Sequence, residues 1–286
     1  MKRAIALSIV ALCFLWIAVC ILHSRTGLPS TDTVRQQMQQ TANELDKTLC
    51  DIEYQTDSLY RLLPAIDQSI FRTENIQQHF DNYMQSHPDV QSILMALNGK
   101  AAHELGDVFP YSLRRNNLIE HPVQAADQQT YLRIGNADWY AGTFSAQIAR
   151  WSRPYQDENG QLIVSRCLPL RDSNDDIYGV LAVNYTLQSL VNSYGTDCPL
   201  PHSRLFITDL EQSILGCTQA ACTGLNLLSI MEQEGWDFNV TDYDNLNWEQ
   251  SGNLPYRRHG KECILYHALL PRHPQWILLL DVSSSK

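Results

Sequence analysis

Basic residues are scarce in this sequence. Lys and Arg total 21 against 31 Asp and Glu, which gives a formal net charge of −10 over 286 residues. A protein that binds nucleic acid needs a basic face to neutralise phosphates, so this balance argues against that class of partner. Charged residues make up 18% and hydrophobic residues 44%, a composition that supports a packed core and excludes wholesale disorder.

Catalytic signatures are also missing. The sequence contains no glycine-rich phosphate loop, dinucleotide-binding fingerprint, nucleophile elbow or zinc-protease helix. His103-Glu104 has no second histidine at helical spacing, and the acidic loop at residues 171–176 lacks the ligand order of a calcium loop. We therefore predict a protein that is not an enzyme, with no catalytic residues, no metal and no cofactor.

Cysteine is sparse, with eight in the chain. The nearest pair outside the N-terminal segment is Cys217 and Cys222, which we take as the first candidate disulfide of an exported protein. A zinc site built from Cys217, Cys222, His259 and Cys263 is the alternative, although its spacing is looser than that of zinc motifs.

The longest uncharged run lies at residues 4–22, directly after Lys2 and Arg3. About 20 apolar residues span a bilayer as a helix, whereas the core of a cleaved signal peptide has only about 7–15. We predict an uncleaved transmembrane helix at 4–22, with residues 1–3 in the cytoplasm and the remainder exported. A cleaved signal peptide and a lipoprotein signal are the alternatives.

A polar but periodic segment follows. Its apolar residues recur at three- and four-residue steps: Val34, Met38, Ala42, Leu45, Leu49, Ile52, Leu59, Leu63, Ile66 and Ile70. This spacing predicts a long helix at residues 30–85, with Pro64 as a kink or as a break between two helices. The helix is either a dimerising stalk or an element that packs on the following domain, and Thr56 interrupts its apolar seam.

After residue 86 the pattern changes to short strands and polar turns. Strands are expected at 90–97, 162–170, 177–185, 203–209, 213–217, 262–270 and 275–282, and helices at 138–149 and 225–234. The economical fold is α+β, with two small antiparallel-sheet subdomains at 86–196 and 197–283.

Several stretches, taken in order, resemble the extracytoplasmic double Cache sensor domain. They are Asp138-Trp139-Tyr140, residues 151–160, Pro169-Leu170, residues 179–183 and residues 266–280. The resemblance implies two PAS-like subdomains, of which 86–196 is membrane-distal and carries a small-molecule pocket, while 197–283 is membrane-proximal. It also implies a single-pass receptor of the bacterial inner membrane, signalling to a histidine kinase, chemoreceptor or serine phosphatase module that this chain does not contain.

A cluster of aromatic and polar residues is the candidate pocket. Aromatic walls suit a planar or cationic ligand, and Arg133 or Arg166 could hold a carboxylate in a bidentate way. The aromatic residues could equally form core, since they dominate core packing. The predicted ligand-binding residues are Tyr131, Arg133, Trp139, Tyr140, Trp151, Tyr155, Arg166 and Asn184.

Two positions depart from the family's amino-acid-sensing subset. That subset carries an Arg two residues before the Trp-Tyr pair and an Asp on the later strand, where this chain has Ala137 and Asn184. Binding of an α-amino acid by the usual family mode is therefore not expected, while a neutral polar ligand or a carboxylate fits Asn184.

Three functions follow from these observations. We expect a ligand-sensing domain of a membrane receptor, with a small molecule, the membrane and a second copy of the chain as partners. An anchored binding or assembly protein without signalling output is the alternative. An exported hydrolase is the third, but the sequence supplies no catalytic constellation for it.

Overall fold

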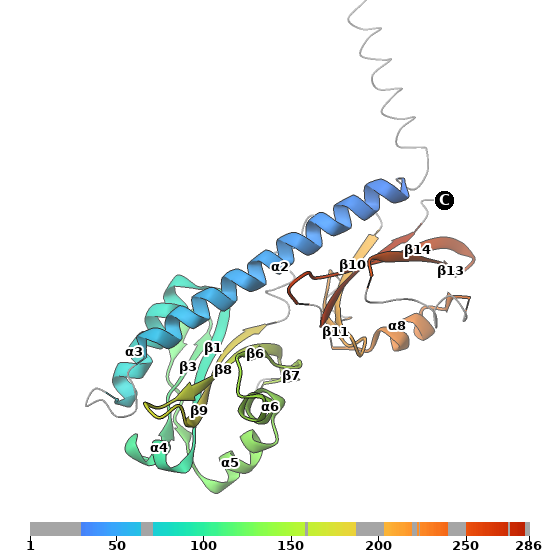
Figure 1. The fold of residues 1–286 in the computed structure, drawn as a ribbon. Helices are drawn as coiled ribbons and strands as arrows, with labels where there is room; N and C mark the ends of the chain where they lie inside the picture. Colours follow the sequence, from blue (N-terminus) through green and yellow to red (C-terminus); the bar gives the residue numbers. More distant parts are fainter. Residues whose placement is uncertain are drawn as a thin grey trace, which may run out of the picture.

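The computed structural model describes residues 30–63, 71–157, 160–186, 203–218, 222, 224–239, 250–273 and 275–283, without the side chains of residues 131 and 132. Within these ranges, no helix is both long and apolar enough to cross a membrane. The transmembrane helix predicted at residues 4–22 and the cytoplasmic residues 1–3 lie outside the described part of the chain. The described residues form an α+β fold of one long helix and two antiparallel sheets, as predicted (Figure 1).

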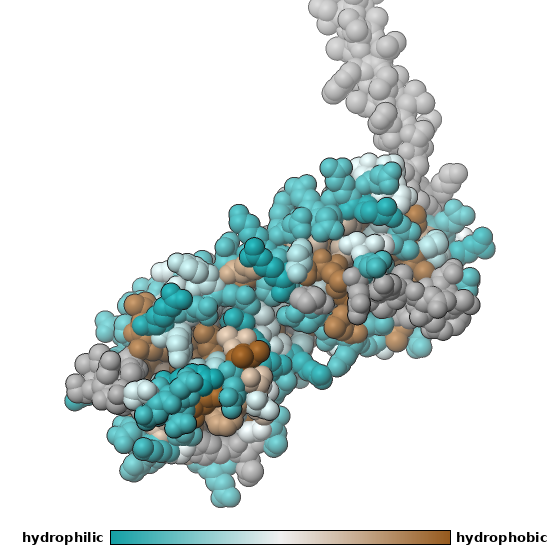
Figure 2. Space-filling model, viewed as in Figure 1, coloured by the Kyte–Doolittle hydropathy of each residue, from teal (hydrophilic) through white to brown (hydrophobic). Residues whose placement is uncertain are grey.

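The long helix α2 (Thr31–Leu62) runs along both sheets (Figure 1). Ser30 caps its start, where the Ser30 hydroxyl accepts a hydrogen bond from the Thr33 amide at 3.3 Å. The predicted seam faces the chain's own sheets, because its residues are buried: Val34, Met38, Ala42, Leu45, Leu49, Ile52 and Leu59. Over α2, most of the visible surface is hydrophilic (Figure 2). The seam therefore packs on the following domain, as one of the two alternatives predicted.

Thr56 does not interrupt the packing of the seam. Its side chain is fully buried, and its hydroxyl donates to the Ile52 carbonyl at 2.8 Å and lies 3.4 Å from the Tyr83 hydroxyl. Tyr83 belongs to helix α3 (Thr73–Ser86), which packs on the first sheet beside α2. Since α2 ends at Leu62 and α3 begins at Thr73, the segment predicted at residues 30–85 forms two helices, which is the alternative to a single helix kinked at Pro64.

The first sheet has seven strands in the order β4-β3-β1-β9-β8-β6, with β7 also paired to β8. Its strands are β1 (Val90–Leu97), β3 (Tyr111–Arg115), β4 (Leu118–Glu120), β6 (Arg150–Trp151), β7 (Tyr155–Gln156), β8 (Leu162–Arg171) and β9 (Ile177–Thr186). The β8–β9 hairpin matches the hairpin predicted from the sequence within one residue at each end. Helices α2 and α3 cover one face of this sheet (Figure 1).

The other face of the first sheet carries three short helices and a small strand pair. These are α4 (Gly99–Glu104), α5 (Gln128–Gly135), α6 (Asp138–Ala146), β2 (Val108–Phe109) and β5 (Gln124–Ala125). Helix α6 is shorter than predicted, because Gln147 takes a left-handed backbone conformation (φ 58°) and its amide donates back to the Thr143 carbonyl. Strand β6 begins only three residues later.

The second sheet has six strands in the order β11-β10-β15-β14-β13-β12. They are β10 (Ser203–Asp209), β11 (Ile214–Cys217), β12 (Trp236–Asp237), β13 (Gly252–Arg258), β14 (Lys261–Leu269) and β15 (Trp276–Ser283), with helix α8 (Leu227–Gln233) beside them. Helix α2 contacts β14 and β15, so it bridges the two sheets. Strands β12 and β13 are absent from the sequence-based expectation.

Cys217 and Cys222 are the candidate disulfide pair predicted from the sequence. No disulfide joins Cys217 to Cys222, and both side chains are buried in an apolar cluster with Cys263 and Phe206. Cysteine packs readily as a small apolar residue, which explains this environment. Within the described residues, Cys217, Cys222, His259 and Cys263 do not bring their ligand atoms together as a zinc site either.

A buried ion cluster joins four elements of the second sheet's subdomain. Asp281 on β15 is 1% exposed and accepts hydrogen bonds from Arg204 at 3.0 Å, from Arg258 at 2.6 Å and from the Tyr256 hydroxyl. Arg204 also pairs with Glu234, directly after α8, at 2.6 Å. Two guanidinium groups and two carboxylates therefore compensate one another inside the fold.

Candidate functional site

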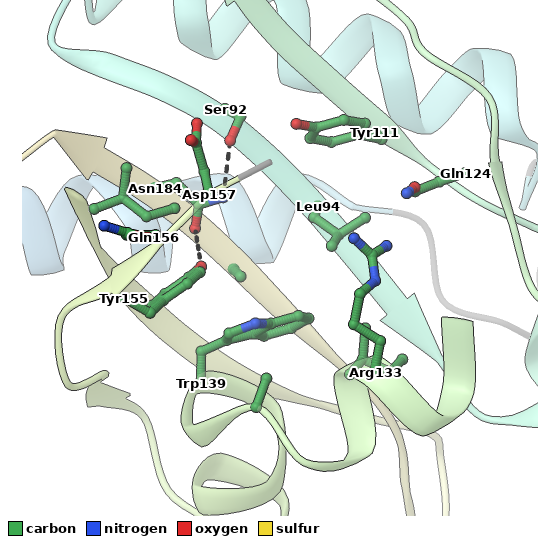
Figure 3. Close-up of a pocket in the computed structure, with 14 residues that line it drawn as sticks. Ser92, Leu94, Tyr111, Gln124, Arg133, Trp139, Tyr155, Gln156, Asp157 and Asn184 are labelled. Carbon is green, nitrogen blue, oxygen red and sulfur yellow. Dashed lines mark hydrogen bonds between the residues drawn. The ribbon is translucent and has the colours of Figure 1, made fainter. Parts of the chain in front are cut away.

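A cavity of about 220 Å³ lies on the face of the first sheet that is turned away from α2 and α3 (Figure 3). Strands β1 and β9 form its floor, and helices α5 and α6 form one wall. Its lining residues are Ser92, Leu94, Tyr111, Gln124, Arg133, Ile134, Ala137, Trp139, Tyr155, Gln156, Asp157, Ile163, Ala182 and Asn184. The lining combines aromatic and aliphatic surface with a few polar groups, as is typical of small-ligand sites.

A polar row crosses the floor of this cavity. Register pairs Ser92 on β1 with Asn184 on β9, and Asn184 with Ser165 on β8, so the three side chains share one face of the sheet. The Asn184 amide nitrogen donates to the Ser92 hydroxyl at 2.8 Å, and the Asn184 carbonyl oxygen accepts from Ser165 at 2.6 Å. These bonds fix the orientation of the Asn184 amide beneath the cavity.

Tyr155 extends the polar row toward the rim. Its hydroxyl lies 2.8 Å from the Ser165 hydroxyl and donates to the Asn184 carbonyl oxygen at 3.5 Å (Figure 3). Burial raises the pKa of the Tyr155 hydroxyl well above its usual value, so this group stays protonated as a hydrogen-bond donor. Asp157 follows two residues later and lines the same side of the cavity.

The helical wall is held by local contacts. Asp127 caps α5 by accepting from the Thr130 amide at 2.7 Å, and Arg133 extends from this helix toward Leu94 in the close-up (Figure 3). Asp138, in the first turn of α6, accepts from the Arg153 amide at 2.8 Å and pairs with Arg150 at 3.3 Å. These bonds tie the start of α6 to the sheet and place the next residue, Trp139, against the cavity.

The cavity gathers half of the predicted ligand-binding residues. Arg133, Trp139, Tyr155 and Asn184 line it, as does Ala137, the other position at which this chain departs from the amino-acid-sensing subset. Tyr140 does not line it. Its ring packs edge-on against Trp139 and stacks on Phe144, with ring centroids 5.7 Å and 5.9 Å apart. Tyr131 belongs to α5, and its side chain lies outside the described residues.

Trp151 and Arg166 lie on the opposite face of the first sheet. They pair with each other in register, and both bind the Glu53 carboxylate of α2, each at 2.9 Å. Arg166 directly follows Ser165, so strand alternation turns its side chain away from the polar row and toward the long helix. These two residues connect the sheet to α2 and do not line the cavity.

Several lining residues have no counterpart in the sequence-based prediction, among them Ser92, Leu94, Tyr111, Gln124 and Asp157. Ser92 and Leu94 alternate along β1 with the side chains that face α2 and α3, but the sequence does not show that β1 pairs with β9. Asp157 was open to prediction, because it follows Tyr155 by only two residues in the sequence.

Part of the chain matches a known protein family. Residues 76–192 match the family model of the first PDC sensor domain of methyl-accepting chemotaxis protein-like proteins. No curated protein sequence matches significantly.

Solved structures of low sequence identity share the fold. The ligand-binding domain of the Pseudomonas aeruginosa PAO1 amino acid chemoreceptor PctB, in complex with L-Arg, is 16% identical with a TM-score of 0.61, covering 88% of this chain and 94% of that one. The extracellular domain of the putative histidine kinase soHK1S-Z6 is 20% identical with a TM-score of 0.65, over 88% and 94% of the two chains. The ligand-binding domain of the Campylobacter jejuni chemoreceptor Tlp3, in complex with L-norvaline, is 15% identical with a TM-score of 0.58, over 88% and 91%.

The resemblance read from the sequence is thereby confirmed. Residues 76–192 match the PDC sensor family, and the described chain has the double Cache fold found in extracellular ligand-binding domains of chemoreceptors and histidine kinases.

Proposed function

We propose that this chain senses a small molecule outside the cytoplasm, through the cavity above the polar row of Ser92, Asn184 and Ser165. The observation that carries the proposal is that row itself: buried, oriented hydrogen-bonding groups lie under an aromatic wall formed by Trp139. The bound state is passed to an output module of the histidine kinase, chemoreceptor or serine phosphatase type, beyond this chain. The predicted helix at residues 4–22 anchors the domain in the bacterial inner membrane.

The lining favours a small carboxylate or a neutral polar molecule with a planar or apolar part. Arg133 offers a guanidinium fork for a carboxylate, and Trp139 offers a flat apolar surface. Positions 137 and 184 carry Ala and Asn, so the paired charges of the amino-acid-sensing subset are missing from those places. An α-amino acid held by that pair is therefore not the ligand we propose.

Signalling uses the junction between the sheets. Ligand draws the segments around residues 100–135, including helix α5, onto Trp139 and Tyr155. The movement reaches Trp151 and Arg166 through the hairpin strands, and from there the Glu53 carboxylate of α2. Coupling of about 1–3 kcal/mol is ordinary for such a switch.

A homodimer through α2 remains part of the proposal, with one constraint. The apolar seam of α2 is occupied by the chain's own sheets, so a second copy would meet the outward face of the helix. That face carries Gln36, Gln40, Glu44 and Lys47, which form a polar surface.

The proposal is tested by a thermal-shift screen of the purified chain against carboxylates, neutral polar metabolites, nucleobases, sugars and amino acids. A ligand at 100 times its dissociation constant stabilises the fold by about 2.7 kcal/mol. Trp139→Ala is expected to abolish the shift. Tyr54→Ala, on an exposed position of α2, is the matched control and leaves the shift intact.

Two results would count against this function. One is the absence of any stabilising compound across the panel, which would favour the anchored assembly protein. The other is a hit whose affinity is the same in the wild type and in Trp139→Ala, because such a ligand binds elsewhere.

A further inference from the structure

Three potential metal ligands of different kinds meet where α2 approaches the turn between β14 and β15. Asp46 and Cys50 are four residues apart on α2, so their side chains lie on one face of the helix. His273 comes from the turn and is 3% exposed. The ligand atoms of these three residues all lie within 4.8 Å of one another. Among the described residues, no other such group of three is this close together.

The two ring nitrogens of His273 are arranged as in histidines that bind a metal through one nitrogen and a carboxylate through the other. Its Nδ1 atom lies 2.7 Å from Asp46 Oδ1, and its Nε2 atom faces Glu53 Oε1 at 3.4 Å. Histidines that bind metals through one nitrogen commonly donate the other N–H to a carboxylate, which sets the tautomer and the ring orientation. Glu53 is in turn held by Trp151 and Arg166.

The Asp46 carboxylate is also held in a fixed orientation by its neighbours. Its Oδ1 atom accepts a hydrogen bond from the Arg272 amide at 2.9 Å, and the residue is 6% exposed. Cys50 is half-buried, so the group opens to solvent on one side. The Arg272 guanidinium donates to Cys50 Sγ at 3.5 Å from an exposed position, and it can swing into water when another cation takes the sulfur.

We propose that Asp46, Cys50 and His273 bind a divalent cation of the zinc class, with water in the fourth position. Thiolate, imidazole and carboxylate together suit Zn²⁺, whereas Ca²⁺ and Mg²⁺ prefer oxygen ligands alone. Bonds of about 2.0–2.3 Å in a tetrahedron require the Nδ1–Oδ1 pair to open by roughly 0.6 Å. Cys50 binds as the thiolate and releases its proton to solvent.

A cation at this site has a defined structural effect. It joins the middle of α2 to the turn that precedes β15, and so ties the long helix to the second sheet. The site lies on the α2 side of the molecule and shares no residue with the ligand cavity. It therefore goes beyond the sensing function, and either proposal can fail without the other.

The test uses the full chain without a polyhistidine tag, reduced and freed of metal with a chelator, and titrated with Co²⁺ as a spectroscopic probe. One equivalent of Co²⁺ is expected to produce the near-ultraviolet absorption of a thiolate–cobalt bond, and Zn²⁺ is expected to remove it. Cys50→Ser should abolish this absorption. Cys222→Ser, at a buried thiol between β11 and α8, is the matched control and should keep it.

Two further variants test the roles of the neighbours. His273→Gln should weaken Co²⁺ binding at least tenfold, and Glu53→Gln should weaken it by about 10–100-fold through loss of the orienting carboxylate. His103→Gln, an exposed histidine on α4, should bind as the wild type does. The proposal is overturned if the wild type shows no thiolate–cobalt absorption, or if the absorption persists in Cys50→Ser. Cys50 is half-exposed, so its serine variant is expected to fold, and circular dichroism verifies this.

Discussion

Trp151 and Trp276 lie against each other where the two sheets meet, with ring centroids 5.5 Å apart and planes inclined by 54°. Trp151 ends the edge strand β6 of the first sheet, and Trp276 begins β15 of the second. Tyr185 on β9 adds a third ring, 6.0 Å from Trp151. The two sheets therefore share an aromatic contact, which makes their stabilities interdependent.

Trp276→Ala is expected to destabilise the whole fold and not the second sheet alone. Truncating a buried tryptophan costs about 3–5 kcal/mol, and here the lost ring also supports Trp151. Urea unfolding followed by circular dichroism and by fluorescence measures this. Ile148→Ala, an exposed position near the start of β6, is the control and should change stability by less than about 0.5 kcal/mol. A loss of less than about 1 kcal/mol in Trp276→Ala would contradict the shared contact.

Asp281→Asn should be among the most damaging single substitutions in the second sheet. It leaves Arg204 and Arg258 without the carboxylate that both of them bind, and breaking a buried ion pair costs about 3–5 kcal/mol. Equilibrium urea denaturation of the variant gives the value. Asp51→Asn, on the exposed face of α2, is the matched control. Equal stability of the two variants would show that the cluster is not stabilising.

The same cluster predicts a loss of stability in acid. The hydrogen bond from Arg204 holds the pKa of the Glu234 carboxyl below its usual value of 4.5, with further lowering by Trp236 and by the charges of Arg204 and Arg258. A carboxyl whose pKa is lower in the folded state stabilises the fold above the unfolded pKa and loses that contribution as pH falls. The free energy of unfolding should therefore drop below about pH 4.5 more steeply in the wild type than in Glu234→Gln. If the free energy of unfolding falls equally steeply with pH in the two proteins, the lowered pKa of Glu234 is contradicted.

The cavity offers a gain-of-function prediction. Ala137 and Asn184 both line it, at the positions where the amino-acid-sensing subset carries Arg and Asp. The double variant Ala137→Arg with Asn184→Asp should acquire binding of α-amino acids, because the new guanidinium and carboxylate can take the ligand's two charges. The hydroxyls of Ser92, Ser165 and Tyr155 surround position 184 and can donate to the new carboxylate.

Thermal shifts with a panel of amino acids measure this gain. Each single variant serves as a control and should show no shift, since one charge alone leaves the other end of the ligand unpaired. No amino acid binding by a folded double variant would show that the cavity differs from that of the subset in shape as well as in charge.

Periodicity made α2 and the β8–β9 hairpin predictable. Leu45 and Leu49 recur with helical spacing, and the polar loop predicted at residues 171–176 separates two apolar runs of equal length. Strands β12 and β13 escaped prediction for a physical reason. Burial alternates along β13 only over its last residues, and Pro255 lies within it, so its sequence resembles a loop.

The composition of the site was only half predictable, and Arg166 shows why. Trp151 and Tyr155 are close in sequence but lie on separate strands, where they pair with Arg166 and Ile163 of β8. These two partners are three residues apart, so strand alternation turns them to opposite faces of the sheet. The register of the hairpin pairs Ser165 with Asn184, and this alone places Arg166 on the other side. The neighbours contributed by β1 depend on a long-range pairing, for which the sequence carries no local signal.

The first turn of α2 and the end of β15 lie at the same end of the molecule, although some 250 residues separate them in the chain (Figure 1). A helix of 32 residues is about 48 Å long, so it behaves as a stiff rod beside the sheets. If α2 slides along the second sheet, the full displacement appears as an offset between the start of α2 and the end of β15. Spin labels at positions 32 and 283, in place of Asp32 and Ser283, would measure that offset directly as a change in the distance between the two labels.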